Sequence, residues 1–175
     1  MPPLNHAVLS ASSAYRWLEC PPSALATADI PDETTIYAQE GSAAHEMAEY
    51  KIRWHLGAKD LAPPNVGNFN AEEIDRYTDS YAYYATDKIE TIRKICPDAI
   101  VMVEQRLDFS NYVKDGFGTG DLVIVADDVL QVIDFKYGKG VTVSAELNPQ
   151  MMLYALGALN LYGYLYDIKT VKTSI

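Results

Sequence analysis

The stretch "FGTGDLVIVADDVLQVIDFKYGKG", residues 117–140, constrains the fold more than any other part of the chain. It contains two short apolar runs rich in β-branched residues, with Asp127-Asp128 between them. Such runs, separated by a short polar turn, predict two strands joined by a hairpin, which we place at residues 121–126 and 129–135. A chain that pairs these strands must bury at least one face of the resulting sheet.

The register of this hairpin decides where its polar residues lie. A symmetric turn pairs Ala126 with Val129 and, further along, Asp121 with Asp134, whereas a three-residue loop or a bulge would shift the pairing. Residues two apart on a strand share a face, so Lys136 joins Asp134. Opposed carboxylates repel each other, and burial beside valines raises the cost. A positive charge is therefore expected beside these acids.

Two sources of that charge are open. Lys136 could form an ion pair with one acid, and exposed pairs of this kind contribute little to stability. A divalent metal ion is the better explanation for two acids and a lysine that converge at strand ends, because hard cations bind oxygen ligands. We therefore expect a metal site at this end of the hairpin.

The N-terminal part of the chain predicts helices. Ser12 is the expected N-cap of a short helix that the Pro21-Pro22 pair ends. Residues 27–41 are polar and irregular, which predicts a loop. A helix is expected from about residue 42 to 56, closed by Gly57.

The remaining segments predict a further strand before the hairpin and a helix and strand after it. A capping box at residues 70–73 begins a long amphipathic helix that ends before Pro97. Residues 99–107 predict a strand, and Asn148 caps an apolar helix that extends to about residue 161. The closing residues 167–175 resemble a strand. This order predicts an α/β fold with a mixed sheet.

Length, charge and hydropathy limit the class of protein. The 175 residues suit a single domain, and the strand-like end leaves open that the chain is part of a longer protein. The net charge of −10 argues against a general nucleic-acid coating protein but not against a local basic groove. No apolar run approaches the roughly 18 residues of a membrane span, and the first residues show no secretion signal. We expect a cytoplasmic protein of a bacterial or phage-infected cell, without a membrane partner.

Four short motifs occur in an order that resembles a known superfamily. "GTGDLVIV" followed by "VIDFK" resembles the D…(D/E)xK signature of PD-(D/E)XK nucleases. "EGSAAHEMAEY" is similar to the first motif of RecB-like nucleases, and "NPQMMLYALGAL" to their Q-x-x-x-Y motif. The resemblance runs from Ser10 to about Leu161 and is closest to phage and prophage nucleases, including a family of uncharacterised function. The matching residues are Gly41, His45, Glu49, Asp121, Asp134, Lys136, Gln150 and Tyr154.

This resemblance implies a restriction-endonuclease-like mixed β-sheet core flanked by helices, and a magnesium or manganese site. Asp121, Asp134 and His45 would be the metal ligands, with the backbone carbonyl of Phe135 in a further position. Glu104 could bind a second ion or remain a solvated strand residue, and both interpretations stay open.

Other residues would assist the reaction. Lys136 would orient or deprotonate the attacking water and offset developing charge. Gln150 and Tyr154 would position the nucleic acid or support the metal ligands. The alternative for Gln150 and Tyr154 is structural hydrogen bonding within an apolar helix. His45, taken alone, is better explained as a surface or core helix residue with a local partner.

Contacts to DNA are expected from a few basic and aromatic side chains. Arg16, Lys114 and Lys139 are candidates for phosphate contact, although each is also consistent with a plain surface charge. Some of the 13 tyrosines could stack on unpaired bases, whereas those in helices are expected to pack.

The two cysteines bear on whether the protein holds an iron–sulfur cluster. "WLECPPSA", with Cys20, resembles the opening of relatives that hold an iron–sulfur cluster. Those relatives supply further cysteines near their C-terminus, and none follows Cys96 in this sequence. We therefore expect no iron–sulfur cluster, and we expect Cys20 to be a buried apolar residue.

The motifs together predict a metal-dependent DNA nuclease, either an exonuclease or an enzyme acting on ends and single strands, in phage recombination or replication. One alternative is a catalytically inactive nucleic-acid-binding or assembly module with the same fold. Another is a hydrolase of small phosphate esters. A homo-oligomer, or a recombination or replication partner protein that supplies a basic groove, is compatible with each of them.

Overall fold

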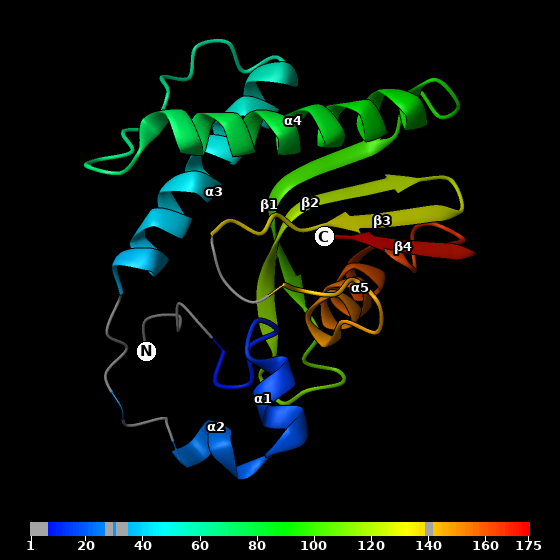
Figure 1. Ribbon diagram of the computed structural model, residues 1–175. Helices are drawn as coiled ribbons and strands as arrows, with labels where there is room; N and C mark the ends of the chain where they lie inside the picture. Colours follow the sequence, from blue (N-terminus) through cyan, green and yellow to red (C-terminus); the bar gives the residue numbers. More distant parts are fainter. Residues whose placement is uncertain (1–6, 27–29, 31–34, 139–141) are drawn as a thin grey trace.

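The computed structural model describes residues 7–26, 30, 35–138 and 142–175, and it has the predicted α/β fold, with a four-stranded mixed sheet between helices (Figure 1). Helices α3 and α4 cover one face of the sheet, and α5 with the short N-terminal helices packs on the other. The elements are α1 (Ala14–Glu19), α2 (Pro22–Ala26), α3 (Ile36–His55), α4 (Ala71–Arg93), β1 (Ile100–Asp108), β2 (Phe117–Ala126), β3 (Val129–Ile133), α5 (Pro149–Tyr162) and β4 (Thr170–Ser174).

The strands lie in the order β1-β2-β3-β4. β1, β2 and β3 are antiparallel neighbours, and β4 runs parallel to β3 because α5 carries the chain back across the sheet. The predicted hairpin register is confirmed, since Ala126 pairs with Val129 and the ladder continues to Leu122 and Ile133. Asp121 and Asp134 follow directly after this last pair.

The sheet separates two hydrophobic cores. Alternate residues of β2 and β3 point to opposite faces, which explains why both strands are apolar almost throughout. The core beneath α5 includes Trp17, Leu107, Val123, Val125, Leu130, Val132, Met151 and Ala158. The core beneath α3 and α4 includes Ala44, Ile52, Ile74, Ile89, Leu122, Ile124, Ile133 and Phe135.

Several predicted boundaries need correction. α3 begins at Ile36, so the prediction of a loop up to residue 41 is wrong. Thr35 is the N-cap, and its side chain accepts a hydrogen bond from the Ala38 N–H at 3.2 Å. The cap of α1 is Ser13 rather than Ser12.

The predicted caps of the long helices are confirmed. The side chain of Asn70 accepts from the Glu73 N–H at 3.2 Å at the start of α4. Asn148 accepts from the Met151 N–H at 3.1 Å at the start of α5. Because Asn148 is itself buried, this cap fixes α5 firmly against the sheet.

The two cysteines differ in their surroundings. Cys96 is buried, but Cys20 is exposed, so the prediction that Cys20 is a buried apolar residue is wrong. Cys20 lies at the end of the six-residue α1, where Pro22 opens α2 and little chain is available to cover it. The exposed thiol therefore contributes nothing to either core.

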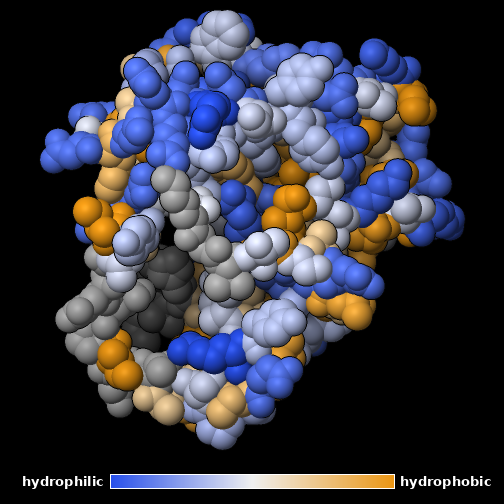
Figure 2. Space-filling model, in the orientation of Figure 1, coloured by the Kyte–Doolittle hydropathy of each residue, from blue (hydrophilic) through white to orange (hydrophobic). Residues whose placement is uncertain are grey.

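The face of the molecule in Figure 2 is mainly hydrophilic, with hydrophobic residues scattered over it. Among the described residues, no helix combines the length and the apolar content that crossing a bilayer requires.

Candidate metal centre

Glu104 and Asp121 face each other across two paired strands. The β1–β2 register is the same on both sides of Glu104, since Val103 pairs with Leu122 and Gln105 with Gly120. Glu104 itself has a φ of 54°, in the left-handed region that a residue with a side chain adopts at a cost of about 1–2 kcal/mol. Backbone strain of this kind inside a strand is concentrated at functional sites. The left-handed φ changes the backbone direction at Glu104 alone, while the residue pairs on either side of it keep the same register.

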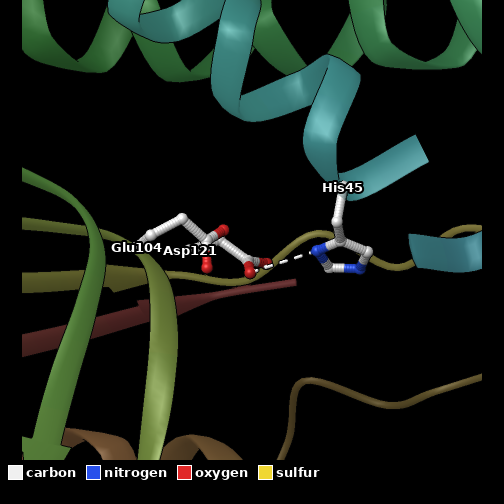
Figure 3. A group of neighbouring side chains, drawn as sticks. All are labelled: His45, Glu104 and Asp121. Carbon is white, nitrogen blue, oxygen red and sulfur yellow. Dashed lines mark hydrogen bonds and ion pairs between the residues drawn. The ribbon is translucent and has the colours of Figure 1, made fainter. Parts of the chain in front are cut away.

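His45 completes a group of three possible ligands. It lies on α3, where the buried Ala44 and Ala48 allow the helix to approach the sheet closely. His45 Nδ1 lies 3.2 Å from Asp121 Oδ1. One ligand atom from each of His45, Glu104 and Asp121 lies within 4.8 Å of the other two (Figure 3).

This arrangement fits a divalent ion. Ligand atoms bound to one ion at about 2.1 Å lie no more than about 4.2 Å apart, so a small inward movement of the side chains is enough to bind it. The donors are one imidazole nitrogen and two carboxylate oxygens. An ion would also neutralise two carboxylates that otherwise face each other across the β1–β2 pair.

The charges of the group shift its pKa values. Burial, with the charges of Asp121 and Glu49, raises the pKa of Glu104 to about 7, although His45 and Arg53 act in the opposite direction. For His45, burial alone would lower the pKa. The hydrogen bond and charge of Asp121, with further acids nearby, outweigh burial and raise it. Both shifts favour proton retention, which is the response expected of clustered acids without a cation.

Tyr81 places a buried hydroxyl group next to the three possible ligands. The narrow cleft beside the three ligands is also lined by Tyr81, Glu49 and Phe135. The phenol oxygen of Tyr81 is buried and has no hydrogen-bond partner among the described residues. A buried hydroxyl without a partner costs about 1–3 kcal/mol, so a small movement that brought an acceptor within reach of this oxygen would stabilise the protein. The helical spacing of Tyr81 predicts packing alone.

Arg53 connects α3 to β1 next to the strained residue. Its Nε donates to Glu49 Oε1 at 2.6 Å, and its Nη2 donates to the Val103 carbonyl at 3.1 Å. Glu49 lies four residues after His45 on the same helical face, as its spacing predicts. The helix-to-strand link through Arg53 was not predicted, although Arg53 continues the same spacing.

A second polar group, formed by Asp134, Lys136, Gln150 and Tyr154, lies on the α5 side. Lys136 Nζ donates to Gln150 Oε1 at 3.0 Å. Gln150 Nε2 in turn lies 3.2 Å from both Asp134 Oδ1 and the Tyr154 hydroxyl. Lys136 Nζ also lies 2.5 Å from Asp134 Oδ2, as an ion pair without hydrogen-bond geometry. Gln150 therefore joins the predicted acid, lysine and tyrosine into one network.

Close packing supports this network. Tyr154 lies against Gly118 of β2, where an added Cβ would be 2.7 Å from the tyrosine ring. Burial is the main reason that the pKa of Tyr154 is raised, so the phenol stays protonated. Burial and the charge of Asp121 raise the pKa of Asp134, while Lys136 and His45 act against that rise.

Asp134 is not part of the compact group of three. Its carboxylate is 3% exposed and is engaged by Lys136 and Gln150, whereas Glu104 lies with His45 and Asp121. Phe135 contacts the group in a different way, since its N–H donates to Asp121 Oδ2 at 2.5 Å. The roles of Asp134 and of the Phe135 carbonyl as ligands stay predictions.

Of the three residues predicted to contact phosphate, the structure describes Arg16 and Lys114. Arg16 is exposed on α1, and Lys114 is exposed in the connection between β1 and β2. Neither is among the described residues that line the narrow cleft. Lys139 lies outside the described residues.

Comparison with known families identifies the chain's relatives. The chain belongs to the family described as "Protein of unknown function (DUF2800)", whose model matches residues 6–175. No solved structure matches the chain.

Proposed function

We propose that this member of an uncharacterised family is a RecB-like nuclease of the PD-(D/E)XK superfamily that hydrolyses DNA with a divalent metal ion. The observation that carries the proposal is the convergence of His45, Glu104 and Asp121 within 4.8 Å, at the end of the hairpin that also bears Asp134 and Lys136. The four motifs named above contribute to these two adjoining polar groups.

Manganese or magnesium is the ion we propose, held by His45, Glu104 and Asp121. Carboxylates suit both ions, and the imidazole makes the set more favourable for manganese than for magnesium. When bound, such an ion polarises a phosphoryl oxygen and lowers the pKa of water. Asp134 and the Phe135 carbonyl would complete the ligand set if Asp134 exchanged its contact with Lys136 for the ion.

Lys136 is the residue we assign to proton movement and charge stabilisation. Its ammonium group lies between Asp134 and Gln150, and its side chain is 36% exposed, so it can reach solvent and substrate. An amine in this position orients an attacking water and stabilises negative charge on a phosphate in the transition state. Gln150 holds the amine at that place and is a positioning residue.

DNA as the polymer, and digestion from an end or a single strand, rest on the resemblance to phage RecB-like enzymes. The net charge of −10 is the observation that favours the alternative of an inactive binding or assembly module, because affinity for phosphate comes mostly from basic surface. Cleavage of nucleotides without cleavage of a polymer would instead indicate a small phosphate-ester hydrolase.

The test is cleavage of end-labelled single- and double-stranded DNA with magnesium, manganese or a chelator. The wild type should cleave only with a divalent ion, and Lys136→Ala should lose cleavage while retaining its circular dichroism spectrum. Lys59→Ala, which changes an exposed lysine stacked on Trp54, is a matched control and should cleave normally. Equal cleavage by wild type and Lys136→Ala would refute the proposal.

A further inference from the structure

A second cavity, larger than the narrow cleft at the three possible ligands, is lined in part by Lys136. It has a volume of about 570 Å³, within the roughly 300–1,000 Å³ of small-molecule sites. Its lining residues come from the N-terminal halves of α3 and α4 and from the segment after β3. Its lining includes Tyr37, Glu40, Glu73, Tyr77, Lys136 and Tyr137.

Aromatic rings form much of the lining. Tyr77 and Tyr137 meet edge to face with ring centroids 5.9 Å apart, yet Tyr77 remains 45% exposed and Tyr37 81% exposed. Large aromatic groups left open to solvent around a cavity are available to stack on a flat ligand.

The same rings connect the cavity to the candidate metal centre. Tyr137 lies 6.3 Å from Phe135, and Phe135 lies 5.3 Å from His45, measured between ring centroids. Lys136 lines the cavity and also belongs to the network with Asp134. A ligand in the cavity would therefore lie next to the group that we assign to phosphate chemistry.

The acids of the cavity limit what the ligand can be. The Tyr137 hydroxyl donates to Glu40 Oε1 at 3.4 Å, and Glu73 lies in the same lining. An ionised carboxylate only accepts hydrogen bonds, so the edge of the ligand that contacts it must carry a hydrogen-bond donor. Cytosine, adenine and guanine each present an exocyclic amino group. Thymine presents one N–H between two carbonyl oxygens, and the carboxylates of the cavity would repel those oxygens.

We propose that this cavity binds an unpaired nucleobase carrying an amino group, from the DNA strand whose phosphate is presented to Lys136. This inference rests on the proposed nuclease function and names its substrate more closely. A base can enter only after it leaves its pair and its stack, so the substrate is a single strand or a frayed end. Stacking on the tyrosines supplies the affinity, and the carboxylates disfavour thymine.

The experiment measures binding without cleavage. Fluorescein-labelled oligo-dC and oligo-dT of about 12 nucleotides are titrated with the full chain in a chelator, with fluorescence anisotropy as the readout. Wild type should bind oligo-dC at least about fivefold more tightly than oligo-dT, since recognition of one base edge contributes roughly 1–3 kcal/mol of discrimination. Tyr77→Ala should weaken oligo-dC binding about tenfold, and Glu40→Gln should remove the difference between the two oligonucleotides.

Tyr83→Ala is the matched control. Tyr83 lies on the same helix as Tyr77 and is 78% exposed, but it lines a different surface with Lys51 and Trp54. Its replacement should leave both affinities unchanged. Thermal unfolding of every variant shows whether the fold is retained.

The outcomes separate this inference from the proposed function. If wild type binds oligo-dC with the predicted dependence on Tyr77 but cleaves nothing with manganese, the base site stands and the nuclease assignment fails. If wild type cleaves DNA but Tyr77→Ala binds both oligonucleotides like wild type, the base site is overturned alone. Binding of tetramethylammonium that depends on Tyr77 and Glu40, without binding of either oligonucleotide, would overturn it in favour of a cation site.

Discussion

The two polar groups at the end of the sheet differ in how their charges are balanced. In the group on the α3 side, Glu104 and Asp121 face a single imidazole, and the pKa values of Glu104 and His45 are raised. In the group on the α5 side, Asp134 has an amine and an amide as partners. The first group is short of positive charge, and the second supplies its own. This difference is the one expected if, as we propose, the first group binds an ion and the second group positions the reacting water and phosphate beside it.

The backbone also differs between the two groups. Glu104 occupies the left-handed region within β1, whereas Gln150 lies in the first turn of α5 behind an asparagine cap. Leu147, just before that cap, also has a positive φ of 50°, but it lies in an exposed connection. Among the described residues, Glu104 is the one non-glycine residue with a positive φ inside a strand, which is consistent with a site shaped for a ligand rather than for stability.

The largest expected effect comes from removing an acid of the α3-side group. Asp121→Asn should lower manganese affinity and the cleavage rate by at least about 100-fold, because it removes one ligand's charge and leaves Glu104 as the only acid of the three. Isothermal titration with manganese and a cleavage assay measure the two effects.

Asp127→Asn, in the exposed hairpin turn, is the control for the loss of one negative charge. It should bind manganese like wild type. Wild-type affinity in Asp121→Asn would show that the group of three does not hold the ion.

The next effect separates the two groups. Gln150→Ala should slow cleavage by about 10–100-fold, because Lys136 and Asp134 lose the amide that holds them. Manganese affinity should change little, since Gln150 makes no contact with the three ligands among the interactions of the described residues. Met152→Ala, an exposed change on the same helix, should affect neither quantity. If Gln150→Ala lost as much manganese affinity as Asp121→Asn, the two groups would have to be regarded as one metal site.

The α3-side group should also make ion binding depend on pH. Glu104, with a pKa of about 7, and His45, with a raised pKa, must lose their protons before they bind a cation. Manganese affinity should therefore rise between about pH 6 and pH 8 by up to about tenfold per pH unit for each proton that is released on binding. Titrations in two buffers of different ionisation enthalpy measure that release, and a pH-independent affinity would contradict it.

The same shifts act in the opposite direction on the metal-free fold. A group whose pKa is raised in the folded state stabilises it below the unfolded pKa, and that contribution is lost as pH rises through the folded value. The metal-free protein should lose stability as pH rises from about 4.5 to 7 through the Glu104 contribution. Added manganese should restore this stability near pH 7.

The smallest effect concerns the strain at Glu104. Glu104→Gly should raise the stability of the metal-free protein by about 1 kcal/mol at neutral pH, because relief of the left-handed backbone exceeds the added chain entropy. Manganese binding should be lost at the same time. Asp115→Gly, at the same φ of 54° in an exposed loop, is the control. Asp115→Gly should raise the stability of the metal-free protein through the same backbone relief, without changing the manganese affinity. A less stable Glu104→Gly would mean that Glu104 is held there for structural reasons.

The sequence predicted those parts that depend on local pattern. Alternation and a symmetric turn were enough for the register of β2 and β3, and asparagine caps marked the starts of α4 and α5. The start of α3 was missed because Thr35 caps it within a stretch that is otherwise typical of a loop. The length of β2 was underestimated because its glycines and threonine resemble a turn, although they pair with β1 from Phe117.

The site shows the limit of such patterns. The four motifs include every residue of the two groups except Glu104, but they do not show how those residues divide between the groups. The left-handed turn at Glu104 carries no sequence signal in a glutamate, so its place beside His45 and Asp121 could not be chosen over a solvated position. The Tyr81 hydroxyl has no hydrogen-bond partner among the described residues because of the depth at which α4 packs, whereas the helical spacing of Tyr81 indicates packing alone.

The measurement that tests the metal site most directly is a crystal structure of the wild type with manganese, with anomalous diffraction used to locate the ion. One manganese peak is expected, within bonding distance of the His45 ring and the carboxylates of Glu104 and Asp121, with the Tyr81 hydroxyl facing its outer ligands. Crystals grown with saturating manganese that show no peak at these three residues, or a peak elsewhere only, would contradict the site.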